Sequence, residues 1–295
     1  MSTRAIVPVK LSLTEGDFYT LWAPKWRQNG SEWQAFLGDD EAVLAFNSPA
    51  ELLCFVESGT KHDLLDHPQW DQFAGRDADR VTPAERDEYD LIGMPVALAG
   101  RPSHQNVSTV ARNLEIASAL ADVAGAEHTT IFFASHSILR NVSRGADHYS
   151  GEQGMSEWSG VGHVIAGNWK AVIEDLDKHV RVVSSDDFDA AKVSDAEERI
   201  SSAAAASAAA AKEAEEKRKA AAEAADPYDN SPWAAAGIDP IKITAQSKSV
   251  YTLRTYLDGK PIFLGKWGEI FTFDSPKTLV RWIMDNDDHD LARVS

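Results

Sequence analysis

Hydrophobic and polar positions alternate with a period of two in two stretches that lie far apart in the chain. Residues 6–13 read IVPVKLSL and residues 238–245 read IDPIKITA, and both runs are rich in β-branched side chains, as strands are. Each run has a proline near its start, which is typical of an edge strand because proline donates no ladder hydrogen bond. The pattern predicts a first strand at the edge of a sheet in each stretch.

Further strand signals and then one helix follow each of these runs. In the second stretch, residues 251–265 read YTLRTYLDGKPIFLG, which predicts a hairpin around Asp258 and Gly259. Ser275 then offers a side-chain cap for a helix, and Pro276 fits the first helical position, where no backbone donor is needed. The helix carries an apolar stripe that would cover one face of the sheet, formed by Leu279, Val280, Trp282 and Ile283.

The first stretch repeats this pattern in two aligned blocks, with a longer connection between them than in the second stretch. Residues 46–65, FNSPAELLCFVESGTKHDLL, align without a gap with residues 273–292, FDSPKTLVRWIMDNDDHDLA. Over the repeated blocks, 16 of 46 aligned positions are identical, which excludes chance similarity. Four residues that we assign structural roles recur in both copies: Ser48, Pro49, His62 and Asp63 in the first, and Ser275, Pro276, His289 and Asp290 in the second. The sequence therefore predicts two copies of one antiparallel sheet-plus-helix module.

Between the copies, the period of the hydrophobic positions changes to 3.6, the period of an α-helix. One stripe runs from Val107 to Ala124 and is followed by Gly125, a residue type that commonly ends helices. A second stripe has spacings of three or four throughout and comprises Trp158, Val161, Ile165, Trp169, Val172, Leu176 and Val180. We expect these helices to form a bundle that completes the first domain.

The segment that follows the bundle has a different composition. From residue 194 to 227 it is dominated by Ala, Glu and Lys, and Ile200 is its only large apolar residue. Such a segment forms a helix from intrinsic propensity but has no stripe with which to pack on a core. We expect it to be a solvated, semi-rigid spacer.

These patterns together predict an α+β protein with three parts. Residues 1–183 form the first domain, in which a β module spans about residues 4–66 and a helical bundle about residues 67–183. Residues 184–232 form an acidic, Ala-rich helical linker. Residues 233–295 form the second β module.

The net charge of -17 narrows the classes of partner. Nucleic acids and anionic membrane surfaces are bound mainly by Lys and Arg, so neither is an expected partner. The single cysteine, Cys54, forms no internal disulfide, the N-terminus lacks the apolar run of a signal peptide, and no apolar stretch is long enough to span a membrane. These features predict a cytoplasmic protein without membrane insertion.

The repeated His-Asp pairs are the first candidates for chemistry. Each pair follows a helix and precedes a leucine, where its side chains can cap chain ends, and we interpret both pairs as structural. The alternative is an enzyme that uses His62 and Asp63 in a site between the sheet and the helical bundle. The sequence contains no His pair with the spacing of a zinc helix and no phosphate-binding loop, and it predicts no catalytic residue, metal or cofactor. A nucleic-acid-associated factor, for example in replication, is a third alternative.

Tryptophans near the strand ends are the candidates for binding. Trp22, Trp26 and Trp33 lie within twelve residues of a predicted hairpin, and Trp267 lies in the turn after residues 263–265. Such rings either close a core or anchor an apolar partner, since Trp is enriched where interfaces concentrate their energy. The four residues are our candidates for client binding, although core closure is the interpretation that we favour for tryptophans at strand ends.

Five phrases of the sequence resemble the actinobacterial SatS family. They are YTLWAPKW at 19–26, SEWQAFLG at 31–38, GIDPIKI at 237–243, YTLRTYLDGKPIFLG at 251–265, and DDHDL at 287–291. The resemblance implies a cytoplasmic, ATP-independent chaperone that binds exported client proteins before translocation by the accessory SecA pathway, with the export machinery as a further partner. In the family, the second domain continues beyond its β module, so we expect the module at 233–295 to be truncated relative to the family.

Overall fold

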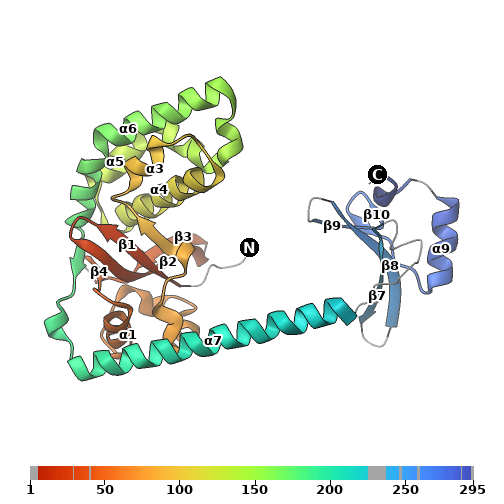
Figure 1. Cartoon of the computed structure of the whole chain (residues 1–295), viewed down its shortest axis with the longest axis horizontal. Coiled ribbons are helices and arrows are strands. Elements are labelled where there is room, and N and C mark those ends of the chain that lie inside the picture. Colours follow the sequence, from red (N-terminus) through yellow and green to blue (C-terminus); the bar gives the residue numbers. More distant parts are fainter. Residues whose placement is uncertain are drawn as a thin grey trace. The chain divides into compact units, whose positions relative to one another are not determined.

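The computed structural model describes residues 6–28, 30–39, 41–224, 237–245, 248–257, 260–286 and 288–293 (Figure 1). The chain divides into two compact units, Met1–Ala211 and Lys212–Ser295. Each unit contains a mainly antiparallel sheet and helices, which confirms the predicted α+β class.

The main sheet of the first unit has the strand order β3-β2-β1-β5. Its strands are β1 (Val7–Leu13), β2 (Gly16–Gln28), β3 (Ser31–Phe36) and β5 (Glu88–Asp90), and a second small sheet pairs β4 (Val43–Ala45) with β6 (Val180–Val182). The prediction that the first strand lies at an edge is wrong here, because β5 pairs in parallel with β1. Pro8 is tolerated because β5 reaches only Lys10–Ser12. Val180, predicted to end a helical stripe, lies in β6 instead.

Helices cover both faces of this sheet (Figure 1). The helices of the unit are α1 (Pro49–Glu57), α2 (Trp70–Ala74), α3 (Met94–Ala99), α4 (His104–Ala124), α5 (Glu127–Ser135) and α6 (Gly151–Asp177), with 3₁₀ turns η1 (Asp63–Asp66), η2 (Ala78–Val81), η3 (Glu85–Asp87), η4 (Ser137–Arg144), η5 (Ala146–Tyr149) and η6 (Ser185–Asp187). One core joins the sheet to α3–α6, and a second core joins its opposite face to α1 and α2.

Both predicted helical stripes are buried in the bundle. Ser103 and Asn106 form a capping box at the start of α4, and Gly125 ends it with a left-handed φ of 70°. On α6, the indole N–H of Trp158 donates to the carbonyl of Gly100 (2.9 Å), and that of Trp169 donates to the carbonyl of Leu91 (2.7 Å). These bonds satisfy polar atoms that the apolar stripe buries.

The helix α7 (Ala190–Ala224) contains most of the segment that was predicted to be a solvated spacer. Its first half packs on the first unit instead: Ala196 is buried, and Ile200 is partly buried against the core beneath α1. The Arg199 guanidinium also donates two hydrogen bonds of 2.8 Å to the carboxylate of Glu57 at the end of α1. The prediction of full solvation is therefore wrong for this part of the helix, because small alanines allow close packing where no large apolar stripe exists.

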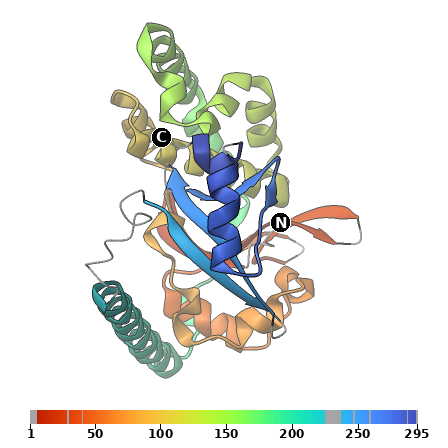
Figure 2. The ribbon, with the colours of Figure 1, turned by 90° about the vertical axis from the view of Figure 1, so that its right-hand side faces the viewer.

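The second unit has a three-stranded sheet of order β7-β8-β9, with one face covered by helix α9 (Figure 2). Its elements are β7 (Asp239–Ala245), β8 (Lys248–Leu257), β9 (Lys260–Phe263), β10 (Gly265–Lys266), β11 (Glu269–Ile270), α9 (Pro276–Asp285) and η7 (Asp290–Arg293). Here the first strand, β7, does lie at an edge, as predicted. The predicted hairpin turn at Asp258 and Gly259 lies outside the described residues. A small core holds α9 to the sheet and includes Leu253, Leu264, Leu279 and Leu291.

The two modules repeat the same hydrogen bonds at aligned positions. The N–H of Tyr19 donates to the carbonyl of Phe46 (2.8 Å), and the N–H of Tyr251 donates to that of Phe273 (2.8 Å). The helices α1 and α9 both start at a serine, Ser48 or Ser275, whose hydroxyl accepts a backbone N–H three residues later, and a proline follows each cap. Ser48, Pro49, Ser275 and Pro276 therefore have the structural role that the repeat predicted.

Replacing Glu57 with Gln should weaken the docking of α7. Hydrogen bonds from Arg199 and Arg80 lower the pKa of Glu57 to about 2, against the opposing effect of burial. Because this value lies below the ~4.3 of an unfolded Glu, the carboxylate stabilises the fold at neutral pH, and that contribution is lost as the pH falls toward 2. We expect Glu57→Gln to lower the free energy of unfolding by roughly 1–2 kcal/mol at neutral pH, after solvent screening.

Urea denaturation at a series of pH values measures this effect. The difference between wild type and Glu57→Gln should shrink as the pH falls through the range between the two pKa values. Glu213→Gln is the matched control, since its pair with Lys217 lies on an exposed part of α7, and it should change stability by less than ~0.5 kcal/mol. A difference for Glu57→Gln that does not vary with pH would contradict the assignment.

Candidate functional site

Trp267 is the most exposed large hydrophobic residue of the described chain, with 88% of its surface accessible. It lies in the turn between β10 and β11 with a φ of 55°, a left-handed conformation that side-chain-bearing residues rarely adopt. The Lys266 ammonium lies 4.3 Å from the centre of the indole ring and also pairs with Asp288. The turn therefore presents an apolar ring to solvent at a conformational cost, which is a feature of binding sites more than of cores.

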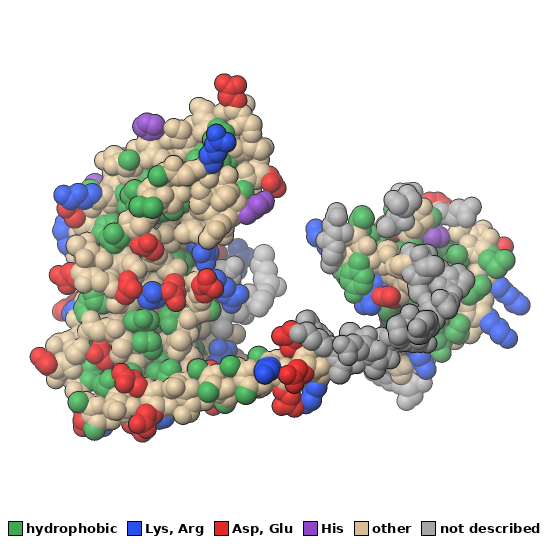
Figure 3. Space-filling model, viewed as in Figure 1, with side chains coloured by type: hydrophobic (Ala, Val, Ile, Leu, Met, Phe, Trp, Pro, Cys, Tyr) green, Lys and Arg blue, Asp and Glu red, His purple; other side chains and the backbone are tan. Residues whose placement is uncertain are grey.

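A second group of apolar side chains lies on the sheet face opposite α9. We call this surface the open face, and it consists of Ile241, Ile243, Val250 and Phe263 in the three-stranded sheet, together with Ile270 of β11, which aligns with Val43 of the first copy. Its strand residues alternate with Tyr251, Leu253 and Ile262, which point to the core beneath α9. Ile243 is 40% exposed and Ile270 is 50% exposed, whereas the other three are half-buried. Hydrophobic side chains are visible on the surface of this unit (Figure 3).

The open face is buried in the first copy of the module. By the alignment, its residues correspond to Val9, Leu11, Phe18, Phe36 and Val43, all of which are at most 6% exposed in the core beneath the helical bundle. The prediction from sequence did not include the open-face residues. The alignment of the two copies could have identified the open-face residues, since each of them matches an apolar position of the first copy that the bundle covers.

The four predicted tryptophans do not share one surface. Trp22 is 5% exposed and stacks on Phe36, with ring centres 6.0 Å apart. Trp26 is 9% exposed and contacts the edge of His67 at 4.5 Å. The client-binding role predicted for Trp22 and Trp26 does not fit this burial, because both rings close cores. Trp33, 55% exposed, lies on β3 of the first unit, and for Trp33 and Trp267 the client-binding role stays a prediction.

The His-Asp pairs occupy turns rather than a reaction centre. His62 is buried edge-on against Trp70 (4.4 Å), and burial lowers its pKa. Asp63 is tied to the first module through its backbone N–H, which donates to the carbonyl of Gly38 (3.0 Å). In the second copy, His289 Nδ1 accepts the backbone N–H of Ala292 (3.0 Å), so the histidine caps η7, which begins at Asp290. The capping predicted for the aspartate side chain thus comes from the histidine in this copy.

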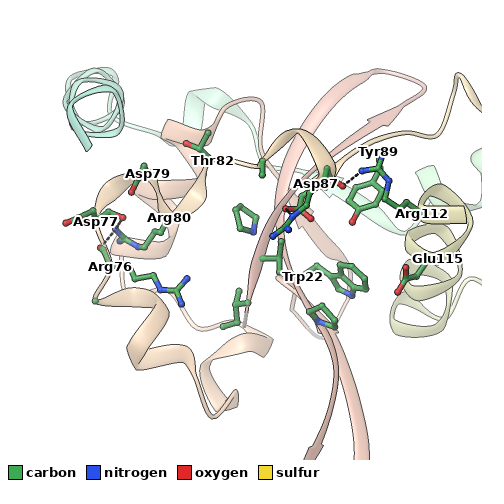
Figure 4. Close-up of a pocket in the computed structure, with 17 residues that line it drawn as sticks. Trp22, Arg76, Asp77, Asp79, Arg80, Thr82, Asp87, Tyr89, Arg112 and Glu115 are labelled. Carbon is green, nitrogen blue, oxygen red and sulfur yellow. Dashed lines mark hydrogen bonds and ion pairs between the residues drawn. The ribbon is translucent and has the colours of Figure 1, made fainter. Parts of the chain in front are cut away.

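A pocket with a volume of about 900 Å³ lies between the edge of β1 and β2, the segment 75–89, and α4 (Figure 4). Neither His62 nor Asp63 lines it, so the predicted enzymatic alternative finds no support there. Its walls carry equal numbers of cations and carboxylates: Arg76, Arg80, Arg86 and Arg112, and Asp77, Asp79, Asp87 and Glu115.

The cations of this pocket are largely engaged. Arg80 pairs with Glu57 (2.9 Å), Arg86 with Asp87 (3.5 Å), and Arg112 donates to the carbonyl of Arg86 (2.6 Å). The pocket therefore does not concentrate positive charge for a phosphate or a nucleic acid.

The described residues contain no cluster of three or more His, Cys, Asp or Glu side chains placed to hold a metal ion. Within the same described part, no helix combines the length and apolar character needed to cross a bilayer.

Comparison with known proteins identifies relatives of the repeated modules. The family model for the SatS C-terminal domain matches residues 6–177 and 238–295, so it covers both copies of the module and the helical bundle. A crystal structure of a SatS C-terminal domain in complex with bromine aligns with 60% of this chain and 94% of its own, at 16% sequence identity and a TM-score of 0.43. No curated protein matches the sequence.

Truncation of a buried tryptophan should lower stability far more than truncation of an exposed one. Trp26→Ala leaves a cavity in the core beneath α1 and should lower the free energy of unfolding by about 3–5 kcal/mol. Trp267→Ala removes a ring that packs on little else and should change it by less than ~0.5 kcal/mol. Urea denaturation followed by far-UV circular dichroism measures both. A loss of several kcal/mol in Trp267→Ala would show that the ring is structural.

Proposed function

Because the chain belongs to the SatS C-terminal domain family, we propose that it is a chaperone that binds exported client proteins before their translocation. Membership of this family points to a secretion-associated, chaperone-like role. The finer proposal is that binding takes place in the cytoplasm, requires no ATP, and precedes contact with the export machinery.

The observation that carries the proposal is the exposed apolar surface of the second unit. Ile243, Ile270 and Trp267 all expose aliphatic or aromatic area within this one module. Burial of apolar area stabilises a complex by roughly 25 cal/mol per Å² and has no directional requirement. Such a surface suits a partner that is recognised by its apolar character rather than by one sequence, as the unfolded segments of exported proteins are.

The distribution of charge suits the same role. Residues 1–236 contain 21 basic and 38 acidic residues, whereas residues 237–295 contain eight of each, so the entire charge of -17 lies outside the second module. A large net charge keeps a complex with an aggregation-prone chain in solution. A neutral module can meanwhile accept clients without repelling acidic ones.

A direct test is the suppression of client aggregation. A chemically denatured exported protein is diluted into buffer with and without this chain, and light scattering is followed over time. We expect near-equimolar chain to suppress scattering, ATP to make no difference, and Trp267→Ala to lose at least half of the suppression, because it removes an exposed anchor.

The matched control is Val96→Ala, which truncates a residue that is 78% exposed on α3 of the first unit. This variant should suppress aggregation as well as wild type does. The proposal is wrong if the chain neither suppresses aggregation nor forms a complex with the client that can be isolated.

A further inference from the structure

We propose that the outer edge of β3 in the first unit receives an extended segment of the client, which adds to the sheet as a further strand. The inference rests on the proposed function for the identity of the partner, and it adds a second place of contact and the conformation of the segment bound there. β3 is the terminal strand in the order β3-β2-β1-β5, so its outer edge faces no other strand of the described residues. In Figure 2 the β2–β3 hairpin, coloured orange-red, projects from the first unit.

The main-chain groups of β3 point alternately toward β2 and away from it. The N–H of Leu37, just beyond the strand, donates to the carbonyl of Leu21 on β2 (2.8 Å). Because direction alternates along an antiparallel ladder, the main-chain groups of Glu32 and Gln34 point to the outer edge. Within the described residues, no backbone group other than those of β2 bonds to the main chain of β3. The outer edge therefore offers hydrogen-bonding groups that an extended chain can match.

The other outer strands of the two larger sheets carry features that prevent this pairing. β5 has only three residues, β7 contains Pro240, and β9 contains Lys260 and Pro261. A proline donates no ladder hydrogen bond, and a lysine charge is costly to cover with another strand. By the alignment, these two residues of β9 stand where β3 has Trp33 and Gln34. β3 has neither proline nor lysine over its six residues, which leaves its edge open to a partner strand.

An apolar side chain lies next to this edge. Trp33 is 55% exposed and lies opposite Trp26 of β2. Neighbouring strands lie about 4.8 Å apart, so an added strand would place its own side chains beside the exposed indole. Main-chain hydrogen bonds accept any sequence, and the ring favours an apolar residue at one position. This combination fits a partner that is recognised because it is unfolded and partly apolar.

Two other occupants fit less well. A helix satisfies its main-chain hydrogen bonds internally, so it would leave the outward groups of Glu32 and Gln34 unpaired. A second copy of this chain would bring β3 against β3 in two molecules that each carry a charge of -17, and the long-range repulsion opposes that association.

The test uses the 295-residue chain and a fluorescently labelled synthetic octapeptide of alternating valine and threonine with blocked ends, which favours the extended conformation. We expect fluorescence anisotropy to show saturable binding. Gln34→Pro should weaken it about tenfold or more, because it removes the outward N–H and introduces the residue that β9 has at the aligned position.

Gln34→Thr is the matched comparison. Both variants lose the side-chain hydrogen bond that Gln34 donates to the carbonyl of Ala119 (3.2 Å), but only the threonine variant keeps the main-chain N–H. It should bind the peptide about fivefold more tightly than Gln34→Pro or better. A control peptide in which two central valines are replaced by proline should not bind.

Amide hydrogen exchange followed by NMR provides a measurement that needs no variant. With the valine-threonine peptide bound, the amides of Glu32 and Gln34 should exchange about fivefold more slowly or better, because each gains an acceptor. Far-UV circular dichroism shows whether Gln34→Pro stays folded, and if it does not, the exchange measurement decides.

Three results overturn the inference: absence of peptide binding, equal affinity of folded Gln34→Pro and Gln34→Thr, or amides of Glu32 and Gln34 that stay unprotected in the complex. So does a concentration-dependent dimer in sedimentation velocity that Gln34→Pro abolishes, since the edge would then belong to a second copy.

The outcome separates this inference from the proposed function. If the chain suppresses client aggregation but does not bind the peptide, the chaperone function stands and strand addition is overturned. If the peptide binds with the expected sensitivity while aggregation is not suppressed, strand addition at β3 stands and the chaperone function fails.

Discussion

An antiparallel sheet built from apolar strands has two faces, and each face must be covered or remain exposed to water. This constraint explains most of the structure. In the first unit, α1 covers one face and the α3–α6 bundle covers the other, so that both sides of β1 and β2 are buried. In the second unit, α9 covers one face of the sheet, which corresponds to the face under α1 in the first unit. The other face corresponds to the one under the bundle, and its apolar side chains are partly exposed.

The two copies keep the apolar character of both sheet faces and differ at positions around them. The face under the helix keeps its leucines, Leu21 and Leu37 in one copy and Leu253 and Leu264 in the other, together with the same backbone hydrogen bonds. On the opposite side, Arg254 stands in place of Trp22, and the turn that contains Asp39 and Glu41 in the first copy contains Lys266 and Trp267 in the second. Substitutions that place charge and an exposed ring around an apolar centre give the module the composition of an interface, with an apolar core and a polar rim.

The sequence was most informative where local rules decide the structure. The alignment of the two modules, the serine caps at Ser48 and Ser275, and the end of α4 at Gly125 depend on neighbouring residues, and the structure agrees with each of them. The parallel pairing of β5 with β1 and the docking of Arg199 on Glu57 depend on residues about 80 and 140 positions apart, for which a single sequence contains no signal. The burial of Trp22 could not be predicted for the same reason, because the pattern shows which face of a strand is apolar and not which element covers that face.

The central claim is that exported clients bind exposed apolar side chains of the second unit, and methyl NMR of the isoleucines tests it most directly. In the 295-residue chain mixed with an unfolded exported protein, the account predicts that the δ1-methyl signals of Ile241, Ile243 and Ile270 shift or broaden. The signals of Ile116 and Ile165, buried in the bundle of the first unit, should stay unchanged. Client binding that leaves the three open-face signals unaffected would contradict the account.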